Sequence, residues 1–133
     1  MATVSYLVDT DILIDWLKGL PWAKRLIWSG ENRLYCSSVT RKELLNKQGL
    51  SDGERKRIMR LLRHIRVLEV DAAIAVAASE LLQKYPHTPL KTSDALIAAT
   101  AWAKHLPLLT RNDKHYNFIE EITLLPIADN ISE

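Results

Sequence analysis

Cysteine, glycine and long apolar runs are scarce in this sequence, and each shortage excludes a class of protein. Cys36 is the one cysteine among 133 residues, which excludes an internal disulfide and a zinc site built from cysteines. The four glycines are scattered and form no loop of the kind that cradles nucleotide phosphates. No uncharged stretch is long enough to cross a bilayer, and the N-terminus lacks the basic segment of a secretory signal. We therefore expect a cytoplasmic protein without a membrane anchor.

An excess of either charge is also missing. Eighteen Lys and Arg residues face sixteen Asp and Glu residues, so the formal net charge is only +2, and 47% of the residues are hydrophobic. This composition excludes a mainly disordered chain, and a nucleic-acid partner has to be argued from local patches. The length predicts a single domain over residues 1–133.

Short β-prone runs alternate with helical patterns along the chain. Such alternation predicts an α/β fold with three layers, in which a short parallel sheet is flanked by helices on both faces. The strand runs are apolar without clean alternation, as is typical of strands that are covered on both sides. We expect strands over 4–8, 34–36, 67–70, 108–110 and 122–125, and helices that end near Gly19 and that span 21–29, 40–47, 52–65, 72–85 and 94–105.

Helix boundaries are predicted from residues that satisfy the free backbone groups at helix ends. Ser51 and Glu54 form a capping-box pattern, and Thr40 with Glu43 forms another. Asp71 is predicted to cap the long Ala-rich helix, and Thr92 or Ser93 to cap the helix that follows.

Acidic residues recur just after the predicted strands or at the starts of the helices that follow. The carboxyl ends of parallel strands share one edge of a sheet, which is where sites of such folds lie. Carboxylates that gather there repel one another, and a hard cation such as Mg²⁺ or Mn²⁺ relieves the repulsion. The pattern predicts a metal-dependent phosphodiesterase whose acids come from Asp9, Asp11, Glu43, Asp94 and Asp113.

Each of these acids also has a purely structural interpretation. Asp9 could cap the first helix, and Asp113 could belong to a turn. Glu43 could complete the capping box with Thr40 or pair with Lys47 four residues later. Asp94 is harder to explain structurally, because it heads the apolar face of its helix.

Basic and aromatic residues offer a second possible interaction surface. Arg57, Arg60 and Arg63 form a stripe that is either a solvated helix face or a set of phosphate contacts. Arg111, beside the acidic cluster, is another candidate for a phosphate contact. Trp22 and Trp28 could lie in the core or serve a partner surface.

Four segments, in order, are similar to the motifs of PIN-domain proteins, especially the VapC-type toxins of toxin–antitoxin systems. The segment 8–14, Val-Asp-Thr-Asp-Ile-Leu-Ile, resembles the family's opening motif, and 93–101, Ser-Asp-Ala-Leu-Ile-Ala-Ala-Thr-Ala, resembles its third-acid helix. Glu43 within 38–44 resembles the second acid, and 108–112 resembles the closing motif.

The resemblance implies a PIN fold and a ribonuclease that cuts single-stranded RNA with Mg²⁺ or Mn²⁺. It also implies a homodimer that a cognate antitoxin holds inactive. Carried onto this chain, the resemblance makes Asp9, Glu43 and Asp94 catalytic metal ligands, with Asp113 or Asn112 as the fourth. The supporting residues are then Thr10, Asp11, Ser93, Arg111 and Asn112.

Two other functions compete with this prediction. Asp9-Thr10-Asp11 also resembles the nucleophile motif of haloacid-dehalogenase-type phosphatases, although Leu13 stands where Thr or Val is expected. Alternatively, the domain could be a binding module without catalysis, although the complete set of three acids argues against it.

Overall fold

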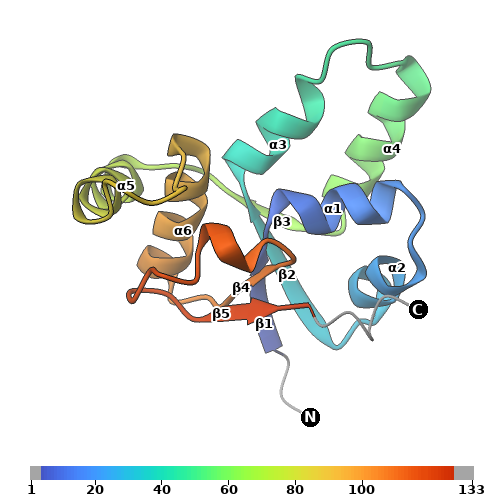
Figure 1. Cartoon of the computed structure of the whole chain (residues 1–133). Helices are drawn as coiled ribbons and strands as arrows, with labels where there is room; N and C mark the ends of the chain where they lie inside the picture. Colours follow the sequence, from blue (N-terminus) through green and yellow to red (C-terminus); the bar gives the residue numbers. More distant parts are fainter. Residues whose placement is uncertain (1–3, 128–133) are drawn as a thin grey trace.

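A parallel sheet runs through the middle of the molecule (Figure 1). The computed structural model describes residues 4–127, and in this range the strand order is β3-β2-β1-β4-β5 with every neighbouring pair parallel. The strands are β1 (Val4–Val8), β2 (Asn32–Ser37), β3 (Arg66–Leu68), β4 (Leu108–Thr110) and β5 (Leu124–Pro126). The predicted three-layer α/β fold is confirmed.

Helices cover both faces of the sheet and enclose two hydrophobic cores. Leu7 and Val8 are both fully buried, but Leu7 packs in the core under α5 and α6, and Val8 in the core under α1, α2 and α4. Leu108 and Leu109 divide in the same way. Successive side chains of a strand point to opposite faces, so both must be apolar here. The helices are α1 (Thr10–Leu17), α2 (Pro21–Trp28), α3 (Ser38–Leu45), α4 (Asp52–Leu62), α5 (Ala72–Lys84) and α6 (Thr92–Lys104).

Several helix ends lie where the local chemistry predicts them. Gly19 and Gly30 follow α1 and α2 with φ of 81° and 73°, a left-handed conformation that glycine adopts without strain. The capping box of Ser51 and Glu54 is present at the start of α4. The Asp71 carboxylate accepts a hydrogen bond from the backbone N–H of Ile74 and caps α5. These predictions are confirmed.

The predicted starts of α3 and α6 are wrong. The Ser37 hydroxyl at the end of β2 accepts a hydrogen bond from the Val39 N–H, so α3 begins two residues early and Thr40 lies inside it, fully buried. The predicted capping box of Thr40 and Glu43 does not form, because a residue inside the helix cannot cap it. At α6 the N-cap is Lys91, and no side chain supplies the capping bond predicted for Thr92 or Ser93.

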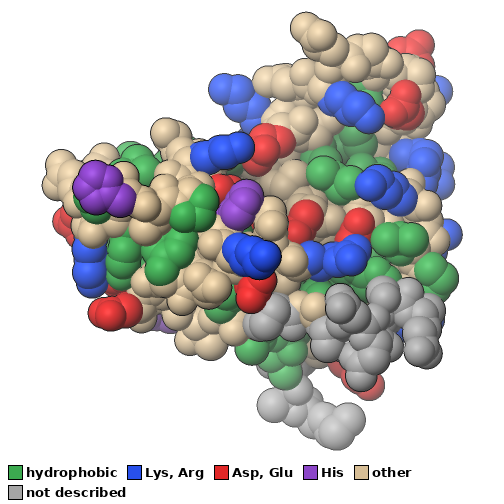
Figure 2. All heavy atoms as spheres, viewed as in Figure 1, with side chains coloured by type: hydrophobic (Ala, Val, Ile, Leu, Met, Phe, Trp, Pro, Cys, Tyr) green, Lys and Arg blue, Asp and Glu red, His purple; other side chains and the backbone are tan. Residues whose placement is uncertain are grey.

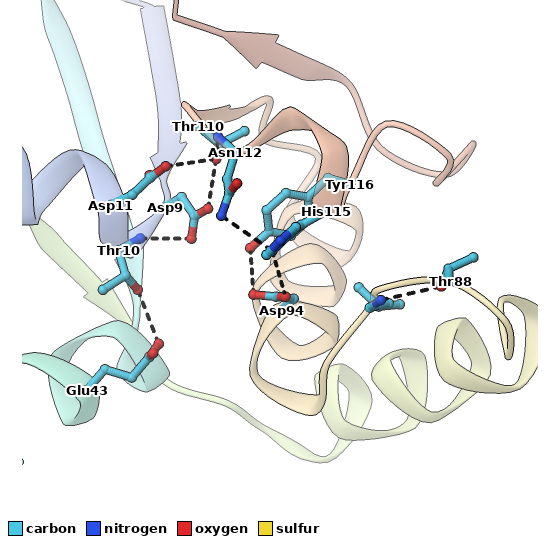
Figure 3. A network of polar contacts seen from close by, with 11 residues as sticks. Asp9, Thr10, Asp11, Glu43, Thr88, Asp94, Thr110, Asn112, His115 and Tyr116 are labelled. Carbon is cyan, nitrogen blue, oxygen red and sulfur yellow. Dashed lines mark hydrogen bonds and ion pairs between the residues drawn. The ribbon is translucent and has the colours of Figure 1, made fainter.

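Smaller differences occur at other boundaries. The helix α4 ends at Leu62, three residues before the predicted end, and β2 extends beyond the predicted 34–36. The short 3₁₀ helix η1 (Asp113–His115) was not predicted. It begins just after β4, with two residues between Thr110 and Asp113, and lies beside Asp9 and Asp94 (Figure 3). No helix within residues 4–127 is long and apolar enough to span a membrane.

Candidate functional site

We call the group of Asp9, Asp11, Glu43 and Asp94 at the carboxyl end of the parallel sheet the acidic edge. Asp9 is its buried centre. It follows β1 directly and is only 6% exposed. One carboxylate oxygen accepts from the Thr10 N–H at 2.8 Å, so Asp9 does cap α1, and the other accepts from the Thr110 hydroxyl at 2.8 Å (Figure 3). The Thr110 bond spans 101 residues of sequence and ties the end of β1 to the end of β4. Capping and site formation are therefore two roles of the same carboxylate.

Glu43 reaches the same edge from α3. Its carboxylate accepts from the Thr10 hydroxyl at 3.2 Å, and the hydroxyls of Thr10 and Thr40 lie 2.8 Å apart. The buried Thr40 thus links α3 to α1, and Thr10, the residue next to Asp9, holds Glu43 (Figure 3). Glu43 forms no ion pair with Lys47 in the described chain, so the structural interpretation of Glu43 fails in both its forms.

Asp94 lies in the first turn of α6, opposite Asp9 and Glu43. The Tyr116 hydroxyl donates to its Oδ1 at 3.2 Å, and His115 Nδ1 lies 3.5 Å from its Oδ2 (Figure 3). Tyr116 is 1% exposed and follows η1, so this short helix delivers two side chains to Asp94. Asp94 Oδ2 is buried without a hydrogen-bond donor in the described chain.

Asp9, Glu43 and Asp94 lie close enough for their charges to act on one another. Burial raises the pKa of Asp9, and the nearby Asp94 carboxylate raises it further against the hydrogen bonds that lower it. Burial also raises the pKa of Glu43, with added repulsion from Asp9 and Asp94. Three acids from β1, α3 and α6 therefore converge, as predicted, rather than pointing to separate parts of the surface.

Asp11 forms a second buried acid beside Asp9. Its Oδ2 accepts from the Arg111 N–H at 3.0 Å and lies 3.4 Å from the Thr110 hydroxyl, which also points toward it. Its Oδ1 is buried without a hydrogen-bond donor in the described chain. Burial, followed by repulsion from Asp9, raises the pKa of Asp11 to about 6. Asp11 is thus part of the acidic cluster rather than only a first-turn acid of α1.

The residues after β4 divide between the site and the scaffold. The side-chain amide of Asn112 lies 3.4 Å from His115 Nδ1, beside Asp9 and Asp94 (Figure 3). Asp113 opens η1, and its backbone carbonyl accepts from the N–H groups of Tyr116 and Asn117. The Arg111 guanidinium pairs with Asp15 at 2.7 Å and lies over the Trp22 ring.

Sequence reasoning missed several residues that build the site: Tyr116, His115, Thr40, Thr110 and Asp15. Tyr116 carries no local signal, because a buried aromatic after a turn is typical of a core position. Thr40 has the pattern of a cap, and only the early start of α3 turns its hydroxyl inward. Ser93, a predicted supporting residue, is half-buried in the first turn of α6 and forms no side-chain hydrogen bond in the described chain.

The donor set at this edge suits a hard divalent cation. All candidate ligands offer oxygen, which Mg²⁺ and Mn²⁺ prefer. Two carboxylate oxygens, Asp11 Oδ1 and Asp94 Oδ2, are buried without a hydrogen bond in the described chain, and His115 Nδ1 lies 3.5 Å from the second of them. No group of three or more His, Cys, Asp or Glu side chains among residues 4–127 is arranged so that it could hold a metal ion as it stands. The fit to a hard cation therefore rests on the oxygen ligands and on these two oxygens without hydrogen bonds.

A groove leads away from the acids between α1, α3 and α4. Its volume is about 410 Å³, and it begins at Thr10 and Glu43. Its lining combines apolar side chains with three basic residues, Lys18, Lys47 and Arg57, and two acidic ones, Glu43 and Glu54. Figure 2 shows side chains of all three kinds on the face of the molecule over α1, α3 and α4. The lining residues are Thr10, Ile14, Leu17, Lys18, Glu43, Leu44, Lys47, Leu50, Glu54, Arg57 and Ile58.

Comparison with known sequences gives consistent matches. A sequence model of the family described as PIN domain matches residues 6–120. Ribonuclease VapC10 of Mycobacterium tuberculosis is 34% identical over 120 residues, which cover 87% of this chain and 89% of that protein. Ribonuclease VapC1 of Methanocaldococcus jannaschii is 28% identical over 121 residues, covering 89% and 83%.

Solved structures match over nearly the whole chain. A chain of a toxin–antitoxin complex from Klebsiella pneumoniae superposes with a TM-score of 0.74 at 29% identity, covering 92% of this chain and 99% of that one. A chain of DNA-bound VapBC from Salmonella typhimurium superposes with a TM-score of 0.81 at 21% identity, covering 93% and 98%. At that identity the second match supports the fold alone.

Proposed function

Because this chain belongs to the PIN-domain family, we propose that it is a ribonuclease and the toxin of a toxin–antitoxin pair, hydrolysing phosphodiester bonds of RNA. The observation that carries the proposal is the convergence of Asp9, Glu43 and Asp94 at the carboxyl edge of the sheet. Relatives named as ribonucleases that cover most of the chain support it. With the family established, the phosphatase alternative has no support beyond a three-residue motif.

The proposed cofactor is Mg²⁺ or Mn²⁺, held by Asp9, Glu43 and Asp94. The fourth position falls to Asn112 or Asp113, and the position of the Asn112 amide beside Asp9 and Asp94 favours Asn112. When bound, such a cation acidifies and orients a water and stabilises the charge that develops on the phosphodiester.

The chain's own residues orient the carboxylates for this task. The Thr110 hydroxyl and the Thr10 N–H each hold one oxygen of Asp9, which fixes the plane of its carboxylate. The Thr10 hydroxyl holds Glu43, and the Tyr116 hydroxyl holds Asp94. Pre-organised groups of this kind need little rearrangement during the reaction, which lowers its barrier.

The decisive test is Asp94→Asn, assayed for cleavage of single-stranded RNA in Mn²⁺ or Mg²⁺. We expect the rate to fall by about 10²- to 10³-fold or more, while circular dichroism and thermal melting show a folded protein. Glu69→Gln is the matched control, since Glu69 is an exposed acid that pairs with Arg41 on the surface. Cleavage by the Asp94 variant at the wild-type rate would contradict the proposed site.

Calorimetric titration with Mn²⁺ separates a nuclease from a binding module without catalysis. We expect Mn²⁺ to bind the wild-type chain and to bind Asp9→Ala far more weakly, because Asp9 lies at the centre of the acids. Absence of Mn²⁺ binding, or binding unaffected by the substitution, supports the module instead.

An antitoxin protein is the proposed partner, because a solved relative is a chain of a toxin–antitoxin complex. We place this pair in the cytoplasm, where an RNA substrate is available. A homodimer is also proposed. The outer face of α5 supports it, because Val76 is 59% exposed there beside the exposed Ala72, Ala73 and Ala75. Light scattering of Val76→Asp tests the dimer, which we expect this substitution to weaken.

A further inference from the structure

A second surface, away from the acidic edge, combines exposed arginines with an exposed tryptophan. We define the Trp28 patch as Trp28, Arg33, Arg63, His64 and Arg66. Trp28 at the end of α2 is 50% exposed, and its ring centroid lies 4.2 Å from that of His64 in an edge-on contact. His64 and the three arginines line a hollow of about 430 Å³ at the start of β2 and β3.

The arginines of the Trp28 patch have no acidic partners within residues 4–127. No Asp or Glu among residues 4–127 forms an ion pair with Arg33, Arg63 or Arg66. All three are exposed. Their positive charge is therefore uncancelled and available to an anionic ligand.

The Trp28 patch lies along α4 from the groove that leaves the catalytic acids. Arg57 lines the groove with Thr10 and Glu43, and its guanidinium donates to the Leu17 carbonyl at 2.7 Å. His64 follows Arg57 by seven residues and lies just beyond the end of α4 at Leu62, so this helix leads from the groove to the Trp28 patch. Trp16 of α1 contacts Trp28 at 6.3 Å between ring centroids, so α1, α2 and α4 meet here.

We propose that the Trp28 patch binds a single-stranded segment of the RNA substrate a few nucleotides from the cleaved bond. The indole of Trp28 stacks on an unpaired base, and the arginines contact the flanking phosphates. A duplex does not suit the patch, because its bases are already stacked on one another. This inference rests on the proposed ribonuclease function and adds a specificity surface to it.

Binding is measured apart from cleavage, with the full chain made inactive by Asp94→Asn and a fluorescein-labelled twelve-nucleotide oligouridine. Adding Trp28→Ala should weaken binding about tenfold, the loss typical of one stacked base. Adding Trp28→Phe should restore most of the affinity, since phenylalanine also stacks. Adding Arg33→Gln and Arg66→Gln should make the binding constant depend less steeply on salt concentration. The change in slope should correspond to the loss of about one phosphate contact or more. The matched control is Arg55→Gln, an exposed arginine near the start of α4 and outside the Trp28 patch, which should change nothing.

Cleavage by the otherwise wild-type chain gives the second readout. Trp28→Ala should raise KM for the twelve-nucleotide RNA about tenfold and leave kcat unchanged. A dinucleotide, which is too short to extend from the acids to the patch, should be cleaved equally by both proteins. If the wild type and a folded Trp28→Ala variant have equal KM values for the twelve-nucleotide RNA, the proposed role of the patch in RNA binding is wrong.

The outcomes separate this inference from the proposed function. If substitution of Trp28 and of the arginines leaves RNA cleavage unchanged, the proposed role of the patch is wrong and the proposed ribonuclease function stands. Oligouridine binding that depends on Trp28, from a chain that never cleaves RNA, supports the patch and contradicts the ribonuclease. Unchanged RNA binding with lost association to a protein partner overturns the assignment in favour of a protein interface.

Discussion

The acidic edge and the Trp28 patch are opposite solutions to the problem of holding like charges together. At the acidic edge, side chains from β1, α3 and α6 are drawn inward, and hydroxyls of Thr10, Thr110 and Tyr116 hold the carboxylates in place. At the Trp28 patch, arginines of neighbouring segments stay in water without ion pairs. Buried charges perturb one another and fix geometry, whereas solvated charges do neither. We therefore expect chemistry at the first region and loose binding at the second.

The largest effect that separates the two regions is expected from Asp9→Asn. It should lower the rate of RNA cleavage by about 10²- to 10³-fold or more, because the central carboxylate is lost. In EDTA the same variant should melt at a higher temperature than the wild type, because the repulsion between Asp9 and Asp94 is removed. Rate assays in Mn²⁺ and thermal melts in EDTA measure the two effects. A variant that loses both activity and metal-free stability would show that Asp9 serves the fold instead.

Tyr116→Phe should have the next largest effect. It removes the hydroxyl that donates to Asp94 and keeps the buried ring. Loss of such a supporting bond typically lowers metal affinity or activity by about 10- to 100-fold. The unfolding free energy should change by no more than about 1 kcal/mol. Calorimetry with Mn²⁺ and urea unfolding are the measurements, and undiminished Mn²⁺ affinity would exclude a positioning role for the hydroxyl.

The acidic edge should also make stability depend on pH in an unusual direction. The folded-state pKa of Asp11 is raised to about 6, and those of Asp9 and Glu43 are raised as well. The folded chain therefore holds protons that the unfolded chain has already released, so these groups stabilise the fold at low pH and lose that effect as pH rises from about 4 through 6.

Thermal melts in EDTA across this pH range test the effect. The contribution of these acids should decline with rising pH, and saturating Mn²⁺ at pH 7 should restore stability by about 2 to 3 kcal/mol at a hundredfold excess over Kd. Asp11→Asn should flatten the decline. A decline of the same size in Asp11→Asn would place its origin in other groups.

Features that depend on neighbouring residues could be predicted from the sequence, whereas features that depend on contacts between distant segments could not. The ends of α1 and α2 at glycines, the capping box of α4 and the Asp71 cap of α5 depend on neighbouring residues, and all are confirmed. The start of α3 depends on whether Ser37 or Thr40 turns toward the backbone, and the packing of Thr40 against Thr10 decides it. Local pattern cannot show that choice.

The acidic edge was predictable in its main acids but not in its supports. Asp9 follows β1, Asp94 lies in the first turn of α6, and Glu43 lies in α3, the helix that follows β2, so the topology of a parallel sheet brings them together. The bond from Thr110 to Asp9 and the bond from Tyr116 to Asp94 join segments distant in sequence or depend on the unpredicted η1. No spacing rule in the sequence encodes them.

The smallest effect on stability is expected from the exposed arginines of the Trp28 patch. Replacing both Arg33 and Arg66 by glutamine should change the unfolding free energy by less than about 0.5 kcal/mol per site, because both are exposed and pair with no acid in the described chain. Urea unfolding measures the change, with Arg55→Gln as the control. A loss of about 2 kcal/mol or more would show that these arginines stabilise the fold. If the double substitution leaves the unfolding free energy unchanged but weakens RNA binding, the arginines of the Trp28 patch contribute to binding and not to stability. At the acidic edge, by contrast, the same carboxylates are expected to affect both activity and stability.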